Sequence, residues 1–171
     1  MTVVVITGIL ATVGIASLRG YVSAARGSEA FAMVQSIRGA EERWRAEHMM
    51  YLNVSSTDEW YPRDPREAET RNTQQSFFYA PDDETHADNA RWLLLRPTVA
   101  GPVRFGYVVN AGPGGGTMTD PTLGPDPSWP APAPDNWYVI QAIGDADGDG
   151  TISYYRSSSL GGQILTENHG E

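Results

Sequence analysis

Three aspartates at alternate positions, Asp145, Asp147 and Asp149, form the part of the sequence best suited to chemistry. Gly150 follows where an ion-binding loop turns sharply, and a hydrophobic residue stands two positions further on. This pattern matches the first two-thirds of an EF-hand loop, which binds Ca²⁺ through six to eight oxygen ligands. Three clustered carboxylates without a cation also repel one another. The pattern therefore indicates a structural Ca²⁺ with the three aspartates as side-chain ligands and the Thr151 carbonyl as a further ligand.

The same residues also favour an ion-free hairpin turn, because Asp and Gly are common turn formers. The twelfth position of the loop is Arg156, where an EF-hand has a bidentate Glu. Residues 151–157 are predicted to form a strand rather than the second EF-hand helix. A complete EF-hand is therefore excluded, and the choice between a structural Ca²⁺ and an ion-free turn stays open.

The rest of the sequence contains no motif of catalytic type. Its three histidines are dispersed, it has no nucleophile elbow, and it has no cysteine. Residues 112–116 lack the Lys-Ser/Thr pair of a phosphate-binding loop. The paired acids Glu41-Glu42 and Asp82-Asp83 are expected to be solvated. We therefore expect no enzymatic activity.

The charge balance argues against nucleic acid as a main partner. The chain of 171 residues has a formal net charge of −9, and phosphate contacts need a basic patch. An acidic surface mainly supports solubility. The length allows one domain of ordinary size plus an anchor.

The elements that would position the aspartate loop begin with an uncharged run over residues 1–18. As a helix this run would span roughly 27 Å, close to the bilayer core of about 30 Å. It lacks the basic region and cleavage site of a signal peptide, and it lacks the polar face of a buried core helix. The run therefore predicts a helix that lies in a membrane or in the core of a filament.

Residues 19–52 are predicted to continue this helix in amphipathic form. An apolar stripe follows alternating helical spacings, is interrupted by Glu47, and leaves most charged residues on the other faces. We expect the stripe to pack on a sheet of the same domain. It consists of Met33, Ile37, Ala40, Trp44 and Tyr51.

Residues 53–171 are predicted to form a globular domain, which makes the fold class α+β. Residues 53–102 form a variable connection with an apolar burst at 92–95, which is either a short helix or an edge strand. Residues 103–171 are predicted to form an antiparallel sheet, because short Gly-containing turns join the later strands. The four strand candidates are residues 103–110, 137–143, 151–157 and 163–167.

The N-terminal third of the chain resembles type IV pilins and the pseudopilins of type II secretion systems. Gly8-Ile9-Leu10-Ala11 matches a tetrad of the family's apolar helix, and Tyr21, Ala24-Ala25-Arg26 and the Glu-Arg-Trp-Arg-Ala-Glu segment resemble its continuation. The resemblance implies a long helix, a variable loop and an antiparallel sheet. The family's opening Phe-Thr-Leu-Ile-Glu motif is missing, so Met1 is expected to align inside the family's mature chain. Ala16 stands where the family often has a kink-forming proline.

The resemblance implies a structural subunit of a type IV pilus-like filament that polymerises through its N-terminal helix. The expected partners are copies of the same chain, inner-membrane assembly machinery and, before assembly, the membrane. The expected location is an extracellular filament on a bacterial surface. Small residues would let the helices approach closely in the filament core, namely Gly8, Ala11, Gly14, Ala16 and Ser17.

Two alternatives remain open at this point. The first is a pseudopilin of a type II secretion system in a periplasmic pseudopilus, which would have the same fold. The second is a membrane-anchored Ca²⁺-binding domain that does not polymerise.

Overall fold

The computed structural model describes residues 2–56, 59–80, 85–119 and 129–168. For residues 2–20 and 23 it describes the backbone without the side chains. The elements in chain order are α1 (Thr2–His48), α2 (Asn89–Leu95), β1 (Gly106–Gly112), β2 (Trp137–Gly144), β3 (Ser153–Ser158) and β4 (Leu165–Glu167). The fold is α+β, as predicted, with a helix packed on a four-stranded antiparallel sheet.

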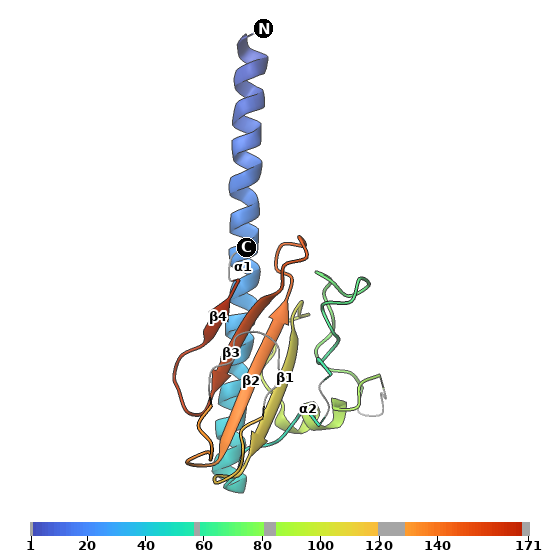
Figure 1. Cartoon of the computed structure of the whole chain (residues 1–171). Helices are drawn as coiled ribbons and strands as arrows, with labels where there is room; N and C mark the ends of the chain where they lie inside the picture. Colours follow the sequence, from blue (N-terminus) through green and yellow to red (C-terminus); the bar gives the residue numbers. More distant parts are fainter. Residues whose placement is uncertain (1, 57–58, 81–84, 120–128, 169–171) are drawn as a thin grey trace.

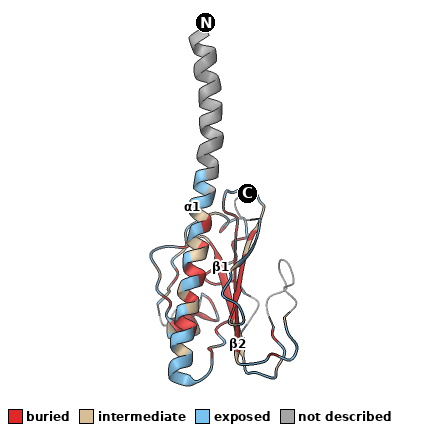
Figure 2. Cartoon of the chain, turned by 90° about the vertical axis from the view of Figure 1, so that its left-hand side faces the viewer, coloured by how far each residue is buried: buried red, intermediate tan, exposed pale blue. Residues whose placement is uncertain are grey.

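Helix α1 is continuous, and its N-terminal part projects beyond the sheet (Figure 1). Its C-terminal part lies along the sheet with one face buried, as Figure 2 shows. The helix ends at His48 because Met49 adopts a left-handed backbone conformation with φ of 62°. The Met49 N–H still donates to the Arg45 carbonyl at 2.8 Å, which closes the last turn. The helix therefore ends before Leu52, where the sequence pattern placed its end.

The sheet is an antiparallel meander in the order β1-β2-β3-β4, as the short turns predicted. In the pairing of β1 and β2, Gly106 lies opposite Ile143. In the pairing of β2 and β3, Gln141 lies opposite Arg156. Strand β4 is the short, exposed edge strand and pairs only with β3. Every residue of β2 is buried, because α1 covers one face of the sheet and connecting segments cover the other.

The main core lies between α1 and the sheet. All five residues of the predicted apolar stripe take part in it, although Tyr51 follows the helix and Trp44 is only partly buried. Tyr51 and Tyr138 meet edge to face with ring centroids 4.7 Å apart. The sheet contributes Tyr107, Val109, Tyr138, Ile140, Ala142 and Tyr155 to this core.

Two smaller apolar clusters cover the other face of the sheet. In one of them Trp60 packs with Val108 and Ile143. In the other, Met118 and Trp129 from the β1–β2 connection pack with strand β2. This covering explains why β2 reads as a nearly continuous apolar run rather than as an alternating one.

The ambiguous apolar burst forms helix α2. Trp92 and Leu95 are buried on its inner side, while Leu94 is exposed. The helix ends at Leu95, because the next residue, Arg96, is left-handed with φ of 51°. The Arg43 side chain from α1 donates to the Leu95 carbonyl at 2.8 Å. A carbonyl group in the last turn of α2 thus gains a hydrogen-bond donor.

Candidate cation site in the β2–β3 loop

The three predicted aspartates lie together in the loop that joins β2 to β3. Asp145, Asp147 and Asp149 each offer a carboxylate oxygen, and these oxygens lie within 4.8 Å of one another. Gly148 and Gly150 have φ of 88° and 97°, so the loop needs glycine at both positions. The Asp-Gly spacing therefore produces a tight turn that brings its three carboxylates close together.

Asp145 is the buried member of the cluster, with 2% of its surface exposed. Its Oδ1 accepts the Gly148 N–H at 2.6 Å, and its Oδ2 accepts the Gly150 N–H at 2.9 Å. The Nε atom of Arg71 lies 4.0 Å from Oδ2. A buried carboxyl group needs such partners, and Asp145 receives them from its own loop and from Arg71.

Asp147 and Asp149 are exposed. Asp147 Oδ1 accepts the Asp149 N–H at 3.1 Å, and Asp149 Oδ1 accepts the Thr151 N–H at 2.6 Å. Hydrogen bonds from the Thr151 backbone and hydroxyl lower the pKa of Asp149. Asp149 is therefore ionised at neutral pH, as a cation ligand must be.

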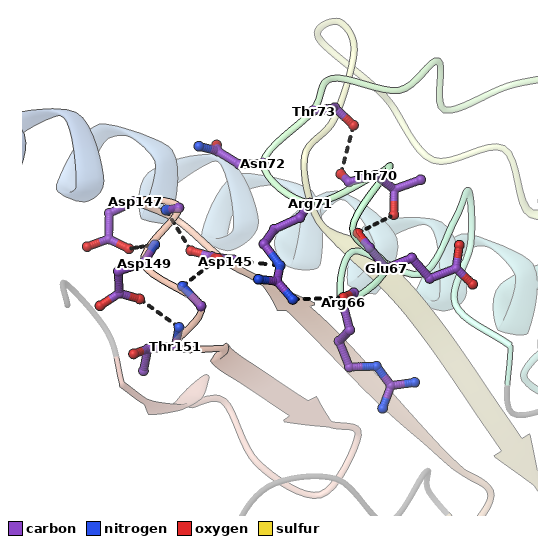
Figure 3. Close-up of polar contacts among 12 residues, drawn as sticks. Arg66, Glu67, Thr70, Arg71, Asn72, Thr73, Asp145, Asp147, Asp149 and Thr151 are labelled. Atoms are coloured by element: carbon purple, nitrogen blue, oxygen red, sulfur yellow. Dashed lines mark hydrogen bonds and ion pairs between the residues drawn. The ribbon is translucent and has the colours of Figure 1, made fainter.

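The loop is docked against two distant segments. The Arg26 Nη1 atom of α1 donates to the Ala146 carbonyl at 2.8 Å and to Asn72 Oδ1 at 2.9 Å. Figure 3 shows Arg71 beside Asp145, with the segment around residues 66–73 running next to the loop. The cluster thus joins the helix, the sheet and the first connection.

The donor chemistry fits a hard cation, because carboxylate oxygens are the ligands that Ca²⁺ prefers. The structure brings together Asp145, Asp147 and Asp149. Thr151 lies beside them, and its N–H donates to Asp149 Oδ1. Both carboxylate oxygens of Asp145 also accept hydrogen bonds from backbone N–H groups. The geometry therefore accommodates both the Ca²⁺ interpretation and the ion-free turn.

The residues predicted to pack helices in a filament core lie outside the described side chains, namely Gly8, Ala11, Gly14, Ala16 and Ser17. Among the residues that are fully described, no helix is both long and apolar enough to cross a membrane.

An uncovered face of α1 was not anticipated from the sequence. A cavity of about 450 Å³ lies along the helix beside Ala25, Ser28 and Ala32, and Val99 and Pro102 line its other side. These small residues recur at helical spacing on a different face from the apolar stripe. This spacing could have indicated the uncovered face from the sequence. Small side chains on an open helix face allow another backbone to approach closely.

The prediction that Glu41 is solvated was wrong. Its side chain is buried on the inner face of α1, and its Oε2 accepts the Leu52 N–H at 3.0 Å. Glu42, by contrast, is exposed as expected. Asp82 and Asp83 lie outside the described residues.

No protein-family model, curated protein or solved structure matches the chain.

Proposed function

We propose that the chain is a structural subunit of a type IV pilus-like filament. The observation that carries the proposal is the form of α1, whose C-terminal part packs on the sheet while its N-terminal part projects beyond it (Figure 1). The projecting part contains the uncharged run of residues 1–18. An apolar helix outside its own domain needs cover from lipid or from other protein.

The proposed mechanism transfers this helix from the membrane into a bundle of identical helices. Association in such a bundle depends on close packing of small residues, here Gly8, Ala11, Gly14, Ala16 and Ser17. The uncovered α1 face at Ala25, Ser28 and Ala32 offers a further contact surface to a neighbouring copy. A contact between two different surfaces of one chain does not close, so it generates an open helical polymer.

Electron microscopy of a sheared cell-surface fraction, with mass spectrometry of the filaments, tests the proposal directly. We expect filaments composed mainly of this chain. Protein that stays entirely with the membrane fraction, with no filament that contains it, would contradict the proposal and favour a non-polymerising anchored domain.

Gly14→Leu tests the packing mechanism. We expect this variant to reduce filament yield strongly while the globular domain stays folded, because a bulky side chain separates closely packed helices. Gly39→Leu is the matched control on the same helix, since a Cβ at Gly39 meets nothing within 4 Å. Normal filament yield from Gly14→Leu would count against close packing at this position.

A pseudopilin of a type II secretion system is the second candidate. The aspartate loop and the absence of cysteine favour it, because a bound ion there would fasten the sheet in a chain that cannot form a disulfide. Deletion of the chain would then block export of secreted proteins without loss of surface filaments. Normal export from the deletion strain would remove this candidate.

We propose Ca²⁺ as the ion that the loop binds, held by Asp145, Asp147 and Asp149 with the Thr151 carbonyl as a further ligand. Ca²⁺ at a hundred times its dissociation constant would stabilise the folded chain by about 2.7 kcal/mol. Thermal unfolding with Ca²⁺ and with a chelator measures this effect, and Mg²⁺ is the control cation. A transition that Ca²⁺ does not shift would establish the ion-free turn.

A further inference from the structure

Glu41 places a carboxyl group inside the apolar interface between α1 and the chain that follows it. Its side chain has 0% of its surface exposed. It lies one helical turn after Ile37, on the stripe that packs against the sheet. A carboxylate at such a position loses its hydration and needs protein donors instead.

Among the residues that the structure describes, the interface supplies one such donor. The Leu52 N–H donates to Glu41 Oε2 at 3.0 Å. The other oxygen, Oε1, is buried without a hydrogen-bond partner among the described residues. One amide is insufficient for a buried negative charge, since each carboxylate oxygen can accept two hydrogen bonds.

Three arginines on the same helix are close in sequence, but each binds elsewhere. Arg38 donates to the Gly162 carbonyl at 2.9 Å, and Arg43 donates to the Leu95 carbonyl at 2.8 Å. Arg45 donates to the Tyr51 hydroxyl at 2.9 Å. None of the ion pairs found within the described ranges includes Glu41.

The other titratable groups near Glu41 do not favour its ionisation either. Glu42 adds a second negative charge on the helix, and it accepts the Tyr51 hydroxyl at 3.0 Å. Tyr138 faces the two glutamates from β2 and is hydrogen-bonded to Arg38. Arg45 donates its hydrogen bond to the Tyr51 hydroxyl and is not paired with Glu41 in the described structure.

We propose that Glu41 is a proton-dependent latch, which holds residues 49–52 against α1 while its carboxyl group is protonated and releases them when it ionises. Ionisation transfers the proton to solvent and leaves a charge with a single N–H partner. Separation of the connection from the helix then lets water reach the carboxylate. Burial raises the pKa of Glu41 to about 8, with Glu42 acting in the same direction and the Leu52 N–H against it.

The latch has a defined place in the fold and does not depend on the proposed filament. Residues 49–52 lead the chain from the end of α1 back toward β1, where the Ser55 N–H donates to the Val109 carbonyl at 2.9 Å. Met49 and Met50 are 80% and 60% exposed, so little packing holds the first half of this connection. Tyr51 is 7% exposed and packs on Tyr138, so release of the second half also separates this ring from the core.

Infrared spectroscopy of the full chain tests the protonation state. We expect a protonated-carboxyl band at neutral pH that disappears with a midpoint near 8 and is absent from Glu41→Gln. Exposed carboxyls are ionised at neutral pH and do not contribute to it. A wild-type spectrum without this band would overturn the proposal, even where the Glu41→Gln variant fails to fold.

Hydrogen exchange tests the release of the connection. Corrected for intrinsic base catalysis, exchange at Leu52 is expected to accelerate roughly tenfold per pH unit between about pH 5 and about pH 8 and to level off above this range, since the open state releases the proton at the usual pKa and the closed state only near 8. Glu42→Gln is the matched control, and it should keep this acceleration. The same acceleration in Glu41→Gln would show that another group controls the segment and would remove the latch.

Discussion

Asp145 and Glu41 both carry buried carboxyl groups, and they lie near opposite ends of the part of α1 that packs on the sheet. They differ in their partners. Asp145 accepts two backbone N–H groups and has Arg71 at 4.0 Å. Glu41 accepts one N–H and has an oxygen without a partner in the described structure. Burial is nearly the same at the two sites, at 2% and 0% exposure.

The comparison indicates that two equally buried carboxyl groups of this protein receive different numbers of hydrogen-bond donors from their surroundings. Donors at Asp145 come from a loop with two positive-φ glycines, which turn their N–H groups onto the carboxylate. The helical backbone at Glu41 is already hydrogen-bonded to itself and offers nothing comparable. A turn can therefore offer a buried carboxyl group backbone donors that a regular helix does not offer.

Asp145→Ala should have the largest effect on stability. It leaves the Gly148 and Gly150 N–H groups without acceptors, which we expect to cost about 4 kcal/mol. Denaturant titration measures the loss, and Asp147→Ala is the exposed control, with an expected cost below about 1 kcal/mol. Equal costs for the two variants would show that burial of Asp145 does not matter.

Glu41→Gln should change the pH dependence of stability. The folded state keeps a proton that the unfolded chain releases, because the folded pKa of about 8 lies above the usual value of 4.5. Wild-type stability should therefore fall as pH rises through this window, by about 3 kcal/mol between about pH 5 and about pH 8 relative to the variant. Urea titrations across this range measure the difference, and parallel curves would contradict it.

Arg26→Gln should have the smallest effect of the three. The variant removes two hydrogen bonds that join α1 to Ala146 and Asn72, and water can replace part of them, so we expect a cost of about 1 kcal/mol. Arg71→Gln should cost less, since its ion pair is long and the side chain is 43% exposed. Chemical denaturation of both variants would show whether Arg71 contributes more than this geometry implies.

The sequence predicted the α+β class, the four strands and the buried helical stripe, because the periodicity of apolar residues and the turn-forming residues determine these features locally. It did not predict where α1 ends, since Met49 has no residue-type signal for its left-handed backbone. The apolar burst at residues 92–95 stayed ambiguous because its helix depends on contacts with Arg43 and the core. Short apolar runs are compatible with either element until tertiary contacts are known.

The aspartate cluster and Glu41 show the same limit at the level of sites. Alternating Asp and Gly predicted that three carboxylates converge, but Arg71 reaches Asp145 only through the tertiary fold. Glu41 was assigned to the solvent face by residue type, although helical spacing places it with Ile37 and Trp44. Here periodicity was the better guide, and the charge of the residue was misleading.

The long-range contacts of α1 also set an order of events during synthesis. Arg26 binds the Ala146 carbonyl 120 residues later in the chain, and Arg38 binds Gly162 later still. At about 5–20 residues per second, the ribosome adds those 120 residues in roughly 6–24 s. The helix is therefore made well before the sheet that covers it, and its apolar stripe stays accessible to chaperones or to a membrane surface throughout that interval.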